Sequence, residues 1–408
     1  MEKKYQSFVF FRHANLRMID NNESILYFRN YKIFIHLNET ATIIVQSFIV
    51  DCNIEKSANK ICKVFDVNYE QAFNDVNNFL FHIQRLYDEK SNSINFDNQK
   101  FISILQKPLS VYLEITNSCN LNCIHCRVPK TNANNIFDNK IYSRIDKLSK
   151  EGVFEVSLTG GEPFNREDIF KIAEHCFNKN LGINILTNGT KITNDVIDWG
   201  KKFLINFYIS LDGMPKTHNI IRGQECGNKI LTMIKRLKEN EIAIEVSTTL
   251  LKMNYHSIKK LCIFLNKYNI NLKVRRFILN NEKDTILLAP IEQYYSFEKH
   301  NNNKLKFPNK SCTAANTSCY IDYKGDVYPC AFLKTPEFYS GNIDNDSFFE
   351  IWNSTVFNQI RNNVFHSCDT CSYYKKNECI GSCHAMSFFL YNRERPDIYC
   401  KKIYYAKK

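Results

Sequence analysis

The sequence predicts an α/β protein whose central part is a parallel sheet of β/α units, with a small α+β unit before it and a cysteine-rich unit after it. Between residues 108 and 280, six apolar runs alternate with amphipathic helical patterns. This alternation is typical of parallel sheets. The first 90 residues show short strand runs followed by three helical patterns, and eight of the 16 cysteines lie between residues 312 and 400.

Length and composition limit the class of protein. A chain of 408 residues exceeds one ordinary core, and 44% apolar with 24% charged residues is globular composition. No apolar run approaches the roughly 20 residues of a membrane span, and the first residues do not form a signal peptide, so we expect a cytoplasmic protein. The net charge of +12 comes from lysines spread along the chain without a dense basic block. That distribution disfavours nucleic-acid binding and suits an acidic peptide partner.

Residues 1–90 are expected to fold as one unit. Strands are predicted at Phe8–Phe11, Ile25–Phe28 and Lys32–Leu37, and Asn38 is a candidate N-cap for the apolar helical run Ile43–Val50. Two further helices are expected at about Glu55–Phe65 and Glu70–Glu89, the second with a continuous apolar face. Strands followed by three helices indicate a small winged-helix-like unit. Residues 91–107 are polar and are expected to be a linker.

At His36–Ile43 and Asp75–Leu80 this unit resembles the PqqD-like recognition element of enzymes that modify ribosomally made precursor peptides, known as RiPPs. The resemblance implies that the leader of a precursor peptide adds a strand to an exposed sheet edge beside the third helix. The alternative is a winged helix that binds DNA or only packs on the next domain.

The central region, residues 108–280, contains the six expected strands. They are Val111–Thr116, Phe154–Leu158, Gly182–Leu186, Ile205–Leu211, Ile242–Leu250 and Leu272–Phe277.

Four motifs follow the first four of these strands. Cys119–Cys126 comes after the first, Thr159–Pro163 after the second and Thr187–Gly189 after the third, while Ser210–Gly213 closes the fourth. Because β/α units carry their sites at the carboxyl ends of parallel strands, we expect the four loops to form one site. The spacing Cys-x3-Cys-x2-Cys at Cys119, Cys123 and Cys126 supplies three thiolates. Three thiolates can hold three irons of a [4Fe–4S] cube and leave the fourth iron open.

Together these motifs resemble the radical S-adenosylmethionine (SAM) superfamily. The resemblance implies a partial (β/α)6 barrel, similar to a TIM barrel, in which Cys119, Cys123 and Cys126 ligate a [4Fe–4S] cluster whose open iron chelates SAM. It also implies SAM contacts for seven other residues. These are His125, Gly160, Gly161, Glu162, Asn188, Ser210 and Arg222.

Individual roles follow from the resemblance. Gly160 and Gly161 lack a Cβ, so that the backbone can approach the methionine part of SAM, and Glu162 pairs with its ammonium group. Ser210 and Arg222 contact the ribose or the carboxylate. Arg222 could instead be a solvated loop charge, and Asn188 a turn residue preceding Gly189.

His125 departs from the family pattern, which usually has another aromatic residue before the third cysteine. A flat ring can still lie beside the adenine. A catalytic acid/base role for His125 is the alternative. The cofactor supplies the chemistry, in which an electron from the cluster cleaves SAM and the resulting 5′-deoxyadenosyl radical abstracts hydrogen from an unactivated carbon.

Residues 281–310 are expected to form a bridge without readable chemistry, and residues 311–408 hold the remaining cysteine cluster. Gly325 indicates the turn of a hairpin that leads to Cys330. The spacing resembles the SPASM domain of peptide-modifying radical SAM enzymes, with seven residues between Cys371 and Cys379 where five are usual. This implies two auxiliary [4Fe–4S] clusters. The first would take Cys312, Cys330 and Cys383, with Cys319 as a candidate fourth ligand, and the second Cys368, Cys371, Cys379 and Cys400.

Two other readings of the cysteines remain. One or two zinc ribbons would also use a Cys-x2-Cys and Cys-x3-Cys pattern. A disulfide scaffold fits poorly, because the chain is large and shows no export signal. Cysteines clustered in a cytosolic chain indicate metal sites.

The sequence therefore predicts a radical SAM RiPP maturase, an oxidoreductase-type enzyme that takes electrons from a flavodoxin- or ferredoxin-type reductant. Auxiliary clusters favour an oxidative cross-link, first a cysteine thioether to an α or β carbon, then a carbon–carbon bond, and last epimerisation. Two rivals are an anaerobic sulfatase-maturing, formylglycine-forming enzyme and a DNA-binding winged-helix regulator with an iron–sulfur sensor. The sequence does not indicate the precursor, the carbon attacked or the oligomeric state.

Overall fold

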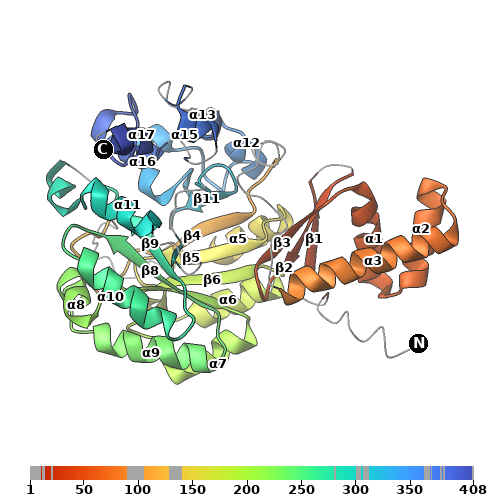
Figure 1. Cartoon of the computed structure of the whole chain (residues 1–408). Coiled ribbons are helices and arrows are strands. Elements are labelled where there is room, and N and C mark those ends of the chain that lie inside the picture. The colour runs from red at the N-terminus through yellow and green to blue at the C-terminus, as the bar shows by residue number, and fades with distance from the viewer. Residues whose placement is uncertain are drawn as a thin grey trace. The chain divides into compact units, whose positions relative to one another are not determined.

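The computed structural model describes residues 11, 14–19, 22–89, 105–127, 140–279, 282–299, 305–306, 312–362, 368, 370–376, 379 and 382–406. The chain forms two compact units, residues 1–106 and 107–408 (Figure 1). In the described part of the chain, no helix is both long and apolar enough to cross a membrane.

The first unit has a three-stranded antiparallel sheet in the order β1-β2-β3. The strands are β1 (Ala14–Met18), β2 (Ser24–Phe28) and β3 (Ile33–Leu37). The second and third of these confirm the predicted strands, and β1 was not anticipated. Of the strand expected at Phe8–Phe11, only Phe11 is among the described residues, and it does not lie in a strand.

Three helices follow the sheet, as the sequence predicts: α1 (Glu39–Asp51), α2 (Ile54–Phe65) and α3 (Tyr69–Asp88). An asparagine caps each one, because its side-chain oxygen accepts a hydrogen bond from a free backbone N–H of the first turn. The Asn38 Oδ1 lies 3.0 Å from the Ala41 nitrogen, and the Asn68 Oδ1 lies 2.8 Å from the Gln71 nitrogen. Apolar residues of the strands and helices form one core, which includes Phe28, Val45 and Leu80.

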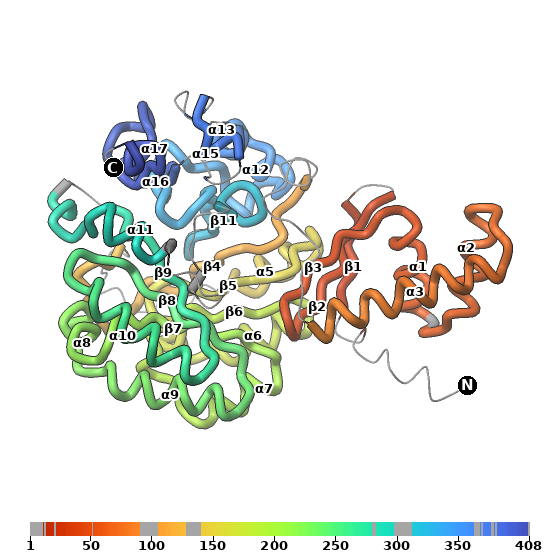
Figure 2. Tube along the Cα trace, in the orientation of Figure 1, coloured from red at the N-terminus to blue at the C-terminus, as the bar shows by residue number. Residues whose placement is uncertain are grey.

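The second unit is built on a nine-stranded sheet in the order β10-β9-β8-β7-β6-β5-β4-β11-β12. All six predicted strands are present, and neighbours among them pair in parallel. They are β4 (Ser110–Thr116), β5 (Glu155–Gly160), β6 (Gly182–Thr187), β7 (Asn206–Ser210), β8 (Ile244–Leu250) and β9 (Leu272–Arg276). The sheet curves, with helices along its outer side (Figure 2). These helices are α5 (Lys140–Lys150), α6 (Ile169–Asn178), α7 (Asn194–Lys202), α8 (Pro215–Arg222), α9 (Gly227–Glu239) and α10 (Tyr255–Asn266).

The carboxyl-terminal region extends this sheet. Strand β11 (Ser318–Ile321) pairs in parallel with β4, and β12 (Val327–Tyr328) pairs antiparallel with β11. Between them Gly325 has φ +91°, which confirms the predicted hairpin turn. The predicted cysteine-rich region from residue 311 therefore contributes two strands to the same sheet as the six central strands.

The bridge and the end of the chain add short elements. The bridge holds a 3-10 helix (Glu282–Leu287), α11 (Ile291–Lys299) and the two-residue strand β10 (Leu305–Lys306), which pairs with β9. After the hairpin come α12 (Phe348–Trp352), α13 (Thr355–Asn362), α15 (Ser372–Lys375), α16 (His384–Tyr391) and α17 (Lys401–Ala406).

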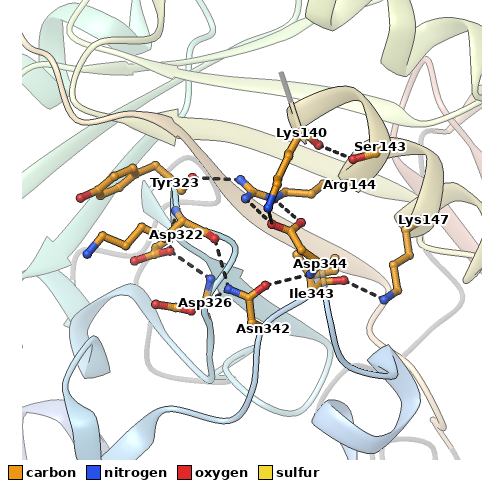
Figure 3. Close-up of polar contacts among 11 residues, drawn as sticks. Lys140, Ser143, Arg144, Lys147, Asp322, Tyr323, Asp326, Asn342, Ile343 and Asp344 are labelled. Carbon is orange, nitrogen blue, oxygen red and sulfur yellow. Dashed lines mark hydrogen bonds and ion pairs between the residues drawn. The ribbon is translucent and has the colours of Figure 1, made fainter. Parts of the chain in front are cut away.

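A buried arginine on α5 fastens the carboxyl-terminal region to the barrel (Figure 3). The Arg144 Nε and Nη2 atoms donate to the two carboxylate oxygens of Asp344, each at 2.7 Å, and Nη1 donates to the Tyr323 carbonyl at 2.9 Å. The Arg144 side chain is 3% exposed. Lys147, one turn along, donates to the carbonyl oxygens of Ile343 and Asp346, each at 2.7 Å. Helix α5 thus holds the segment that follows the hairpin.

Replacing Arg144 by Met should destabilise the second unit, because the Asp344 carboxylate loses its bidentate hydrogen bonds to the guanidinium. We expect a loss of about 3 kcal/mol in the free energy of unfolding, measured by urea titration followed by circular dichroism. Lys140→Met is the matched control. Its Nζ lies 3.5 Å from the same carboxylate, but its side chain is 64% exposed, so a change under about 0.5 kcal/mol is expected. Equal effects of the two substitutions would contradict the prediction.

Candidate functional site

The three-cysteine loop follows β4 and is fastened to the far side of the barrel. Cys119 is exposed, while Cys123 and Cys126 are half-buried. The Ile124 N–H donates to the Ile221 carbonyl at 3.0 Å, which ties the loop to the end of α8. Partial removal of the thiols from water raises the pKa of Cys123, and also that of Cys119 although this residue as a whole is exposed, and each also interacts electrostatically with Cys126. The three sulfur atoms therefore lie in one neighbourhood, as the motif predicts.

The two glycines of the second motif permit a close backbone approach. A Cβ on Gly160, which has φ +128°, would lie 1.9 Å from the Thr116 carbonyl oxygen. A Cβ on Gly161 would lie 2.1 Å from the Ser118 carbonyl oxygen. The N–H groups of Gly161 and Glu162 donate to these same two carbonyls, at 2.7 and 2.8 Å. In this structure, then, the glycines let the end of β5 lie directly against the cysteine loop.

Glu162 is enclosed by the chain itself. The residue is 0% exposed. Its Oε1 accepts from the Thr187 hydroxyl at 2.7 Å and from the Phe164 N–H at 3.2 Å, and its Oε2 accepts from the Asn188 N–H at 2.7 Å. Burial raises the pKa of Glu162. In this structure Glu162 therefore braces the second motif loop against the third, and its predicted pairing with the SAM ammonium stays a prediction.

Asn188 reaches from the third motif back to the first. Its side-chain nitrogen donates to the Asn120 Oδ1 at 2.9 Å and lies 4.0 Å from the Cys119 sulfur. Its Oδ1 accepts from the Thr190 N–H and hydroxyl, at 3.0 and 2.7 Å. The turn-residue alternative is thus only part of its role, because the same side chain also contacts the cysteine loop.

Arg222 and Asp212 form a buried ion pair beside Cys123. The Arg222 Nε lies 2.6 Å from the Asp212 Oδ2, and its Nη1 lies 3.6 Å from the Cys123 sulfur. The side chains are 11% and 0% exposed, so Arg222 is not a solvated loop charge. Burial opposes ionisation of both groups, but Arg222 holds the pKa of Asp212 below its usual value and Asp212 raises the pKa of Arg222.

Asp212 is held from all sides, by residues that the sequence did not single out. Its Oδ1 accepts from the Thr249 N–H at 3.0 Å, its carbonyl accepts from Asn254, and its own N–H donates to the His218 Nδ1 at 3.1 Å. Asn254 and His218 are fully buried. Buried polar residues such as these bind only other residues of the protein, and no local sequence pattern distinguishes them from ordinary polar residues.

His125 and Ser210 also lie at this edge of the sheet. Ser210 ends β7, in register with Ser247 of β8. The His125 Nε2 lies 3.8 Å from the Asp212 Oδ2, and its Nδ1 is buried without a hydrogen-bond partner among the described residues. Burial lowers the pKa of His125, which favours a neutral ring. The seven predicted contact residues therefore lie on the four motif loops and on α8.

Three carboxyl-terminal cysteines lie near one another. Burial raises the pKa of the Cys330 thiol to about 12 and that of Cys383 to about 11. Cys312 interacts electrostatically with both, and they interact with each other. Cys330 follows β12, and Cys383 is the residue before α16. The structure thus brings together the three cysteines predicted for the first auxiliary cluster.

Cys319 does not belong to this group. Along β11 successive side chains point to opposite faces. The Tyr320 hydroxyl donates to the Glu114 Oε2 at 2.6 Å, and Tyr320 interacts with Cys330. Cys319, 1% exposed, interacts instead with Arg361 of α13. The alternation of the strand turns Cys319 toward α13 and away from Cys330 in this structure, and its role as a fourth ligand stays a prediction.

The cysteines predicted for the second auxiliary cluster lie in two segments that pack together. Cys368 and Cys371 are buried, and the Cys371 N–H donates to the Cys368 carbonyl at 2.9 Å. The Tyr373 and Tyr405 rings stack with centroids 5.4 Å apart, which joins the segment after Cys371 to α17, the helix that follows Cys400. Cys379 and Cys400 are half-buried.

A buried ion pair positions Cys383. Arg276, at the end of β9, has its Nη1 3.0 Å from the Asp397 Oδ2, and the same oxygen accepts from the Cys383 N–H at 2.8 Å. Arg276 also lies over the Tyr294 ring, 4.9 Å from its centroid. The last strand of the predicted barrel therefore carries the arginine that orders one of the auxiliary cysteines.

The donor chemistry of these groups fits iron–sulfur clusters better than a single metal ion. Among the described residues, no three Cys, His, Asp or Glu side chains are gathered as ligands of one ion. Each cysteine of a [4Fe–4S] cube binds a different iron, so the ligands of a cube stand further apart than those of one ion. Two separate groups of three cysteines match that requirement.

Comparisons with known proteins agree with this geometry. Residues 113–265 match the radical SAM superfamily, and residues 312–373 match the SPASM iron–sulfur cluster-binding domain. The chain is 25% identical over 331 residues to the mycofactocin maturase MftC of Mycobacterium tuberculosis, covering 71% of this chain and 82% of that protein. It is 26% identical over 334 residues to an AdoMet-dependent heme synthase of Methanosarcina barkeri, covering 70% and 94%.

Among solved structures, Streptococcus suis SuiB bound to its precursor peptide SuiA aligns with a TM-score of 0.66 and 18% identity. That alignment covers 95% of this chain and 98% of SuiB, and so extends into residues 1–106. The radical SAM match includes the cysteine loop after β4, and the SPASM match includes strands β11 and β12 of the same sheet. The chain is therefore a radical SAM enzyme that uses SAM, a [4Fe–4S] cluster and auxiliary iron–sulfur clusters.

Proposed function

We propose that this enzyme is a RiPP maturase, which abstracts hydrogen from a precursor peptide and forms an oxidative cross-link. The observation that carries the proposal is that the SAM-cluster loop follows β4 and that the β11–β12 hairpin, which leads to Cys330, joins the same sheet beside β4. Such an enzyme can make a radical and also accept an electron near it. The similarity to a mycofactocin maturase and the fold match to SuiB with its peptide support a peptide substrate.

In this proposal Cys119, Cys123 and Cys126 hold the SAM cluster. When bound there, the cluster and SAM supply a 5′-deoxyadenosyl radical that abstracts hydrogen from carbon. The chain's own residues position the reactants. Arg222, fixed by Asp212, presents a positive charge next to Cys123 and suits the SAM carboxylate. His125, neutral and half-enclosed, offers a flat face to the adenine.

Glu162 and the two glycines act on the site indirectly in this proposal. The glycines allow the cysteine loop to lie against β5, and Glu162 connects that contact to Thr187 and Asn188. The position of the cysteine loop then depends on the internal hydrogen bonds of Glu162, which can remain in place when SAM binds. Asn188, with its nitrogen near the Cys119 sulfur, completes the connection on the SAM side.

The auxiliary cysteines bear on which product forms, because a cross-link requires an electron acceptor and epimerisation does not. A thioether forms when carbon loses a hydrogen atom and the thiol loses a proton, and one further electron must leave the substrate. Epimerisation removes no such electron. Cys312, Cys330 and Cys383 would hold the nearer auxiliary cluster by three thiolates, since Cys319 points away from them. An iron without a protein thiolate could bind the substrate cysteine, and this favours the thioether over a carbon–carbon bond.

The first unit is proposed to hold the leader. Strands β1 and β3 are the two edges of its described sheet, and an edge has backbone groups free to pair with an added strand. Strand β3 leads directly into α1 through the Asn38 cap, so its position is fixed by the helices. The proposed location is cytoplasmic and the proposed reductant is a flavodoxin or ferredoxin.

An anaerobic sulfatase-maturing activity is the second candidate. It would use the same barrel and SPASM domain, but it would not require residues 1–106. A DNA-binding regulator is disfavoured, because the enzyme domains occupy most of the chain. Dependence of the reaction on the first unit therefore separates these functions.

Co-expression of the enzyme with a candidate precursor peptide should lower the peptide mass by about two hydrogens per cross-link. A peptide whose mass is unchanged but which takes up deuterium from heavy water would indicate epimerisation. Deleting residues 1–106 should weaken leader binding at least about tenfold in fluorescence anisotropy, while SAM cleavage without peptide persists. Full modification of a leaderless peptide by the deletion variant would contradict leader recognition and favour the sulfatase-maturing reading.

Replacing Arg222 by Met should weaken SAM binding roughly tenfold or more, because a hydrogen bond to a charged partner contributes about 1.5–3 kcal/mol. Equilibrium dialysis against labelled SAM with reconstituted, iron-replete protein measures this. Lys216→Met, an exposed change on the same helix, should leave the dissociation constant unchanged. Unchanged SAM affinity in the Arg222→Met variant would remove Arg222 from the SAM site.

Cys319→Ser should retain the full iron content, because Cys319 faces α13 rather than the auxiliary cysteines. Cys330→Ser should lose about four irons and four sulfides per chain, the content of one cube. Iron and acid-labile sulfide assays after anaerobic reconstitution test this pair. If the two variants lose iron equally, Cys319 is a ligand after all.

A further inference from the structure

Arg127, the residue directly after Cys126, lies against two aromatic rings from the segments that carry the auxiliary cysteines Cys330 and Cys383. Its guanidinium carbon is 4.6 Å from the centroid of the Phe389 ring and 5.4 Å from that of Phe332. Phe332 follows Cys330 by two residues, and Phe389 lies on α16, which begins after Cys383. The guanidinium thus contacts aromatic rings from both segments that carry these cysteines, and it also interacts electrostatically with Cys330 and Cys383.

The charge of Arg127 is not compensated by an ion pair in the described structure. Its Nη1 atom is buried and has no hydrogen-bond partner among the described residues. Asp284 interacts with it only electrostatically. Arg276, which also interacts with Cys383, is different, because Asp397 neutralises it at 3.0 Å. Arg127 is therefore a positive charge that acts on Cys330 and Cys383 and has a buried Nη1 without a partner among the described residues.

Such a charge should affect electron transfer more than it affects folding. When a [4Fe–4S] cluster accepts one electron, it becomes one unit more negative, and no bond or proton changes. A fixed positive charge stabilises that reduced form, and it does so strongly where burial keeps the local dielectric low. Aromatic rings hold the guanidinium in place without neutralising it.

We propose that Arg127 raises the reduction potential of the auxiliary cluster bound by Cys312, Cys330 and Cys383, and so makes that cluster the acceptor of the electron left on the peptide. The inference rests on the proposed assignment of these cysteines and on the proposed oxidative reaction. The electron passes from the substrate radical to the oxidised cluster, which is reduced by one unit. Arg127 is a positioning residue here, since it acts through the cluster.

The test is a redox titration of the reconstituted full-length enzyme, with dithionite as reductant, mediators, and electron paramagnetic resonance of the reduced clusters. The SAM-cluster signal is the one that changes when SAM is added, which leaves the two auxiliary signals. In Arg127→Met, we expect one auxiliary midpoint potential to become more negative. Arg127→Lys, which keeps the charge, should remain near the parent value.

Arg393→Met is the matched control. Arg393 is a half-buried arginine in the same region, 5.8 Å from the centroid of the Phe338 ring, and only burial shifts its pKa, without a cysteine partner. Its loss should move neither auxiliary potential. Unchanged potentials in iron-replete Arg127→Met would overturn the proposal.

A purely structural role of Arg127 has its own signature. If Arg127→Met does not load its clusters, Arg127→Gln, which keeps a planar hydrogen-bond donor without the charge, takes its place. Loss of iron in both variants, with full iron in Arg127→Lys and Arg393→Met, would mean that Arg127 supports the fold and would overturn the proposal as well. Because iron content and potential are measured without peptide, failure of this inference is distinct from failure of the proposed maturase function.

Discussion

The close contact between the end of β5 and the cysteine loop is the constraint on which the rest of the site depends. At Gly160 and Gly161 the backbones approach so closely that any Cβ would overlap a carbonyl oxygen of the loop. Two N–H groups at the same place donate to those carbonyls. The loop that carries the SAM-cluster cysteines is therefore positioned by a strand rather than by its own residues, and a strand in the middle of a sheet moves little.

A second set of contacts fixes the opposite side of the loop. Glu162 connects the β5 end to the third motif, while Asp212 connects the fourth motif to Arg222, Thr249 and His218. Both carboxylates are fully buried, and each is satisfied by internal donors. Burying a carboxylate is costly unless its hydrogen bonds are complete, so these two networks are specific to one arrangement of the loops.

The sequence predicts the regular elements well, because their signals are local. Apolar runs that alternate with amphipathic helical patterns indicate β4 to β9, and Asn38 indicates the start of α1 by the hydrogen bond it can make. Gly325 marks its hairpin for a similar reason. These features depend on a few consecutive residues, and each was confirmed.

What the sequence could not predict depends on contacts between distant segments. The parallel pairing of β11 with β4 joins residues about two hundred positions apart, and no local pattern indicates it. The direction of Cys319 could not be predicted for the same reason, since it is set only once β11 has entered the sheet. Glu162 and Asp212 belong to motifs, but their enclosure results from neighbours on other strands. Arg127 carried no signal, because its ring contacts come from residues more than two hundred positions later.

The β4–β11 pairing has a consequence for how electrons could travel. Neighbouring strands in a sheet stand about 4.8 Å apart, held by a ladder of backbone hydrogen bonds. The SAM-cluster loop leaves β4, and the hairpin that leads to Cys330 begins with β11, the neighbour of β4 in the sheet. Their separation is then set by a covalent and hydrogen-bonded lattice, without an intervening hinge. An electron released at one end of that lattice would meet its acceptor at the same distance in every turnover, whichever peptide lies between them.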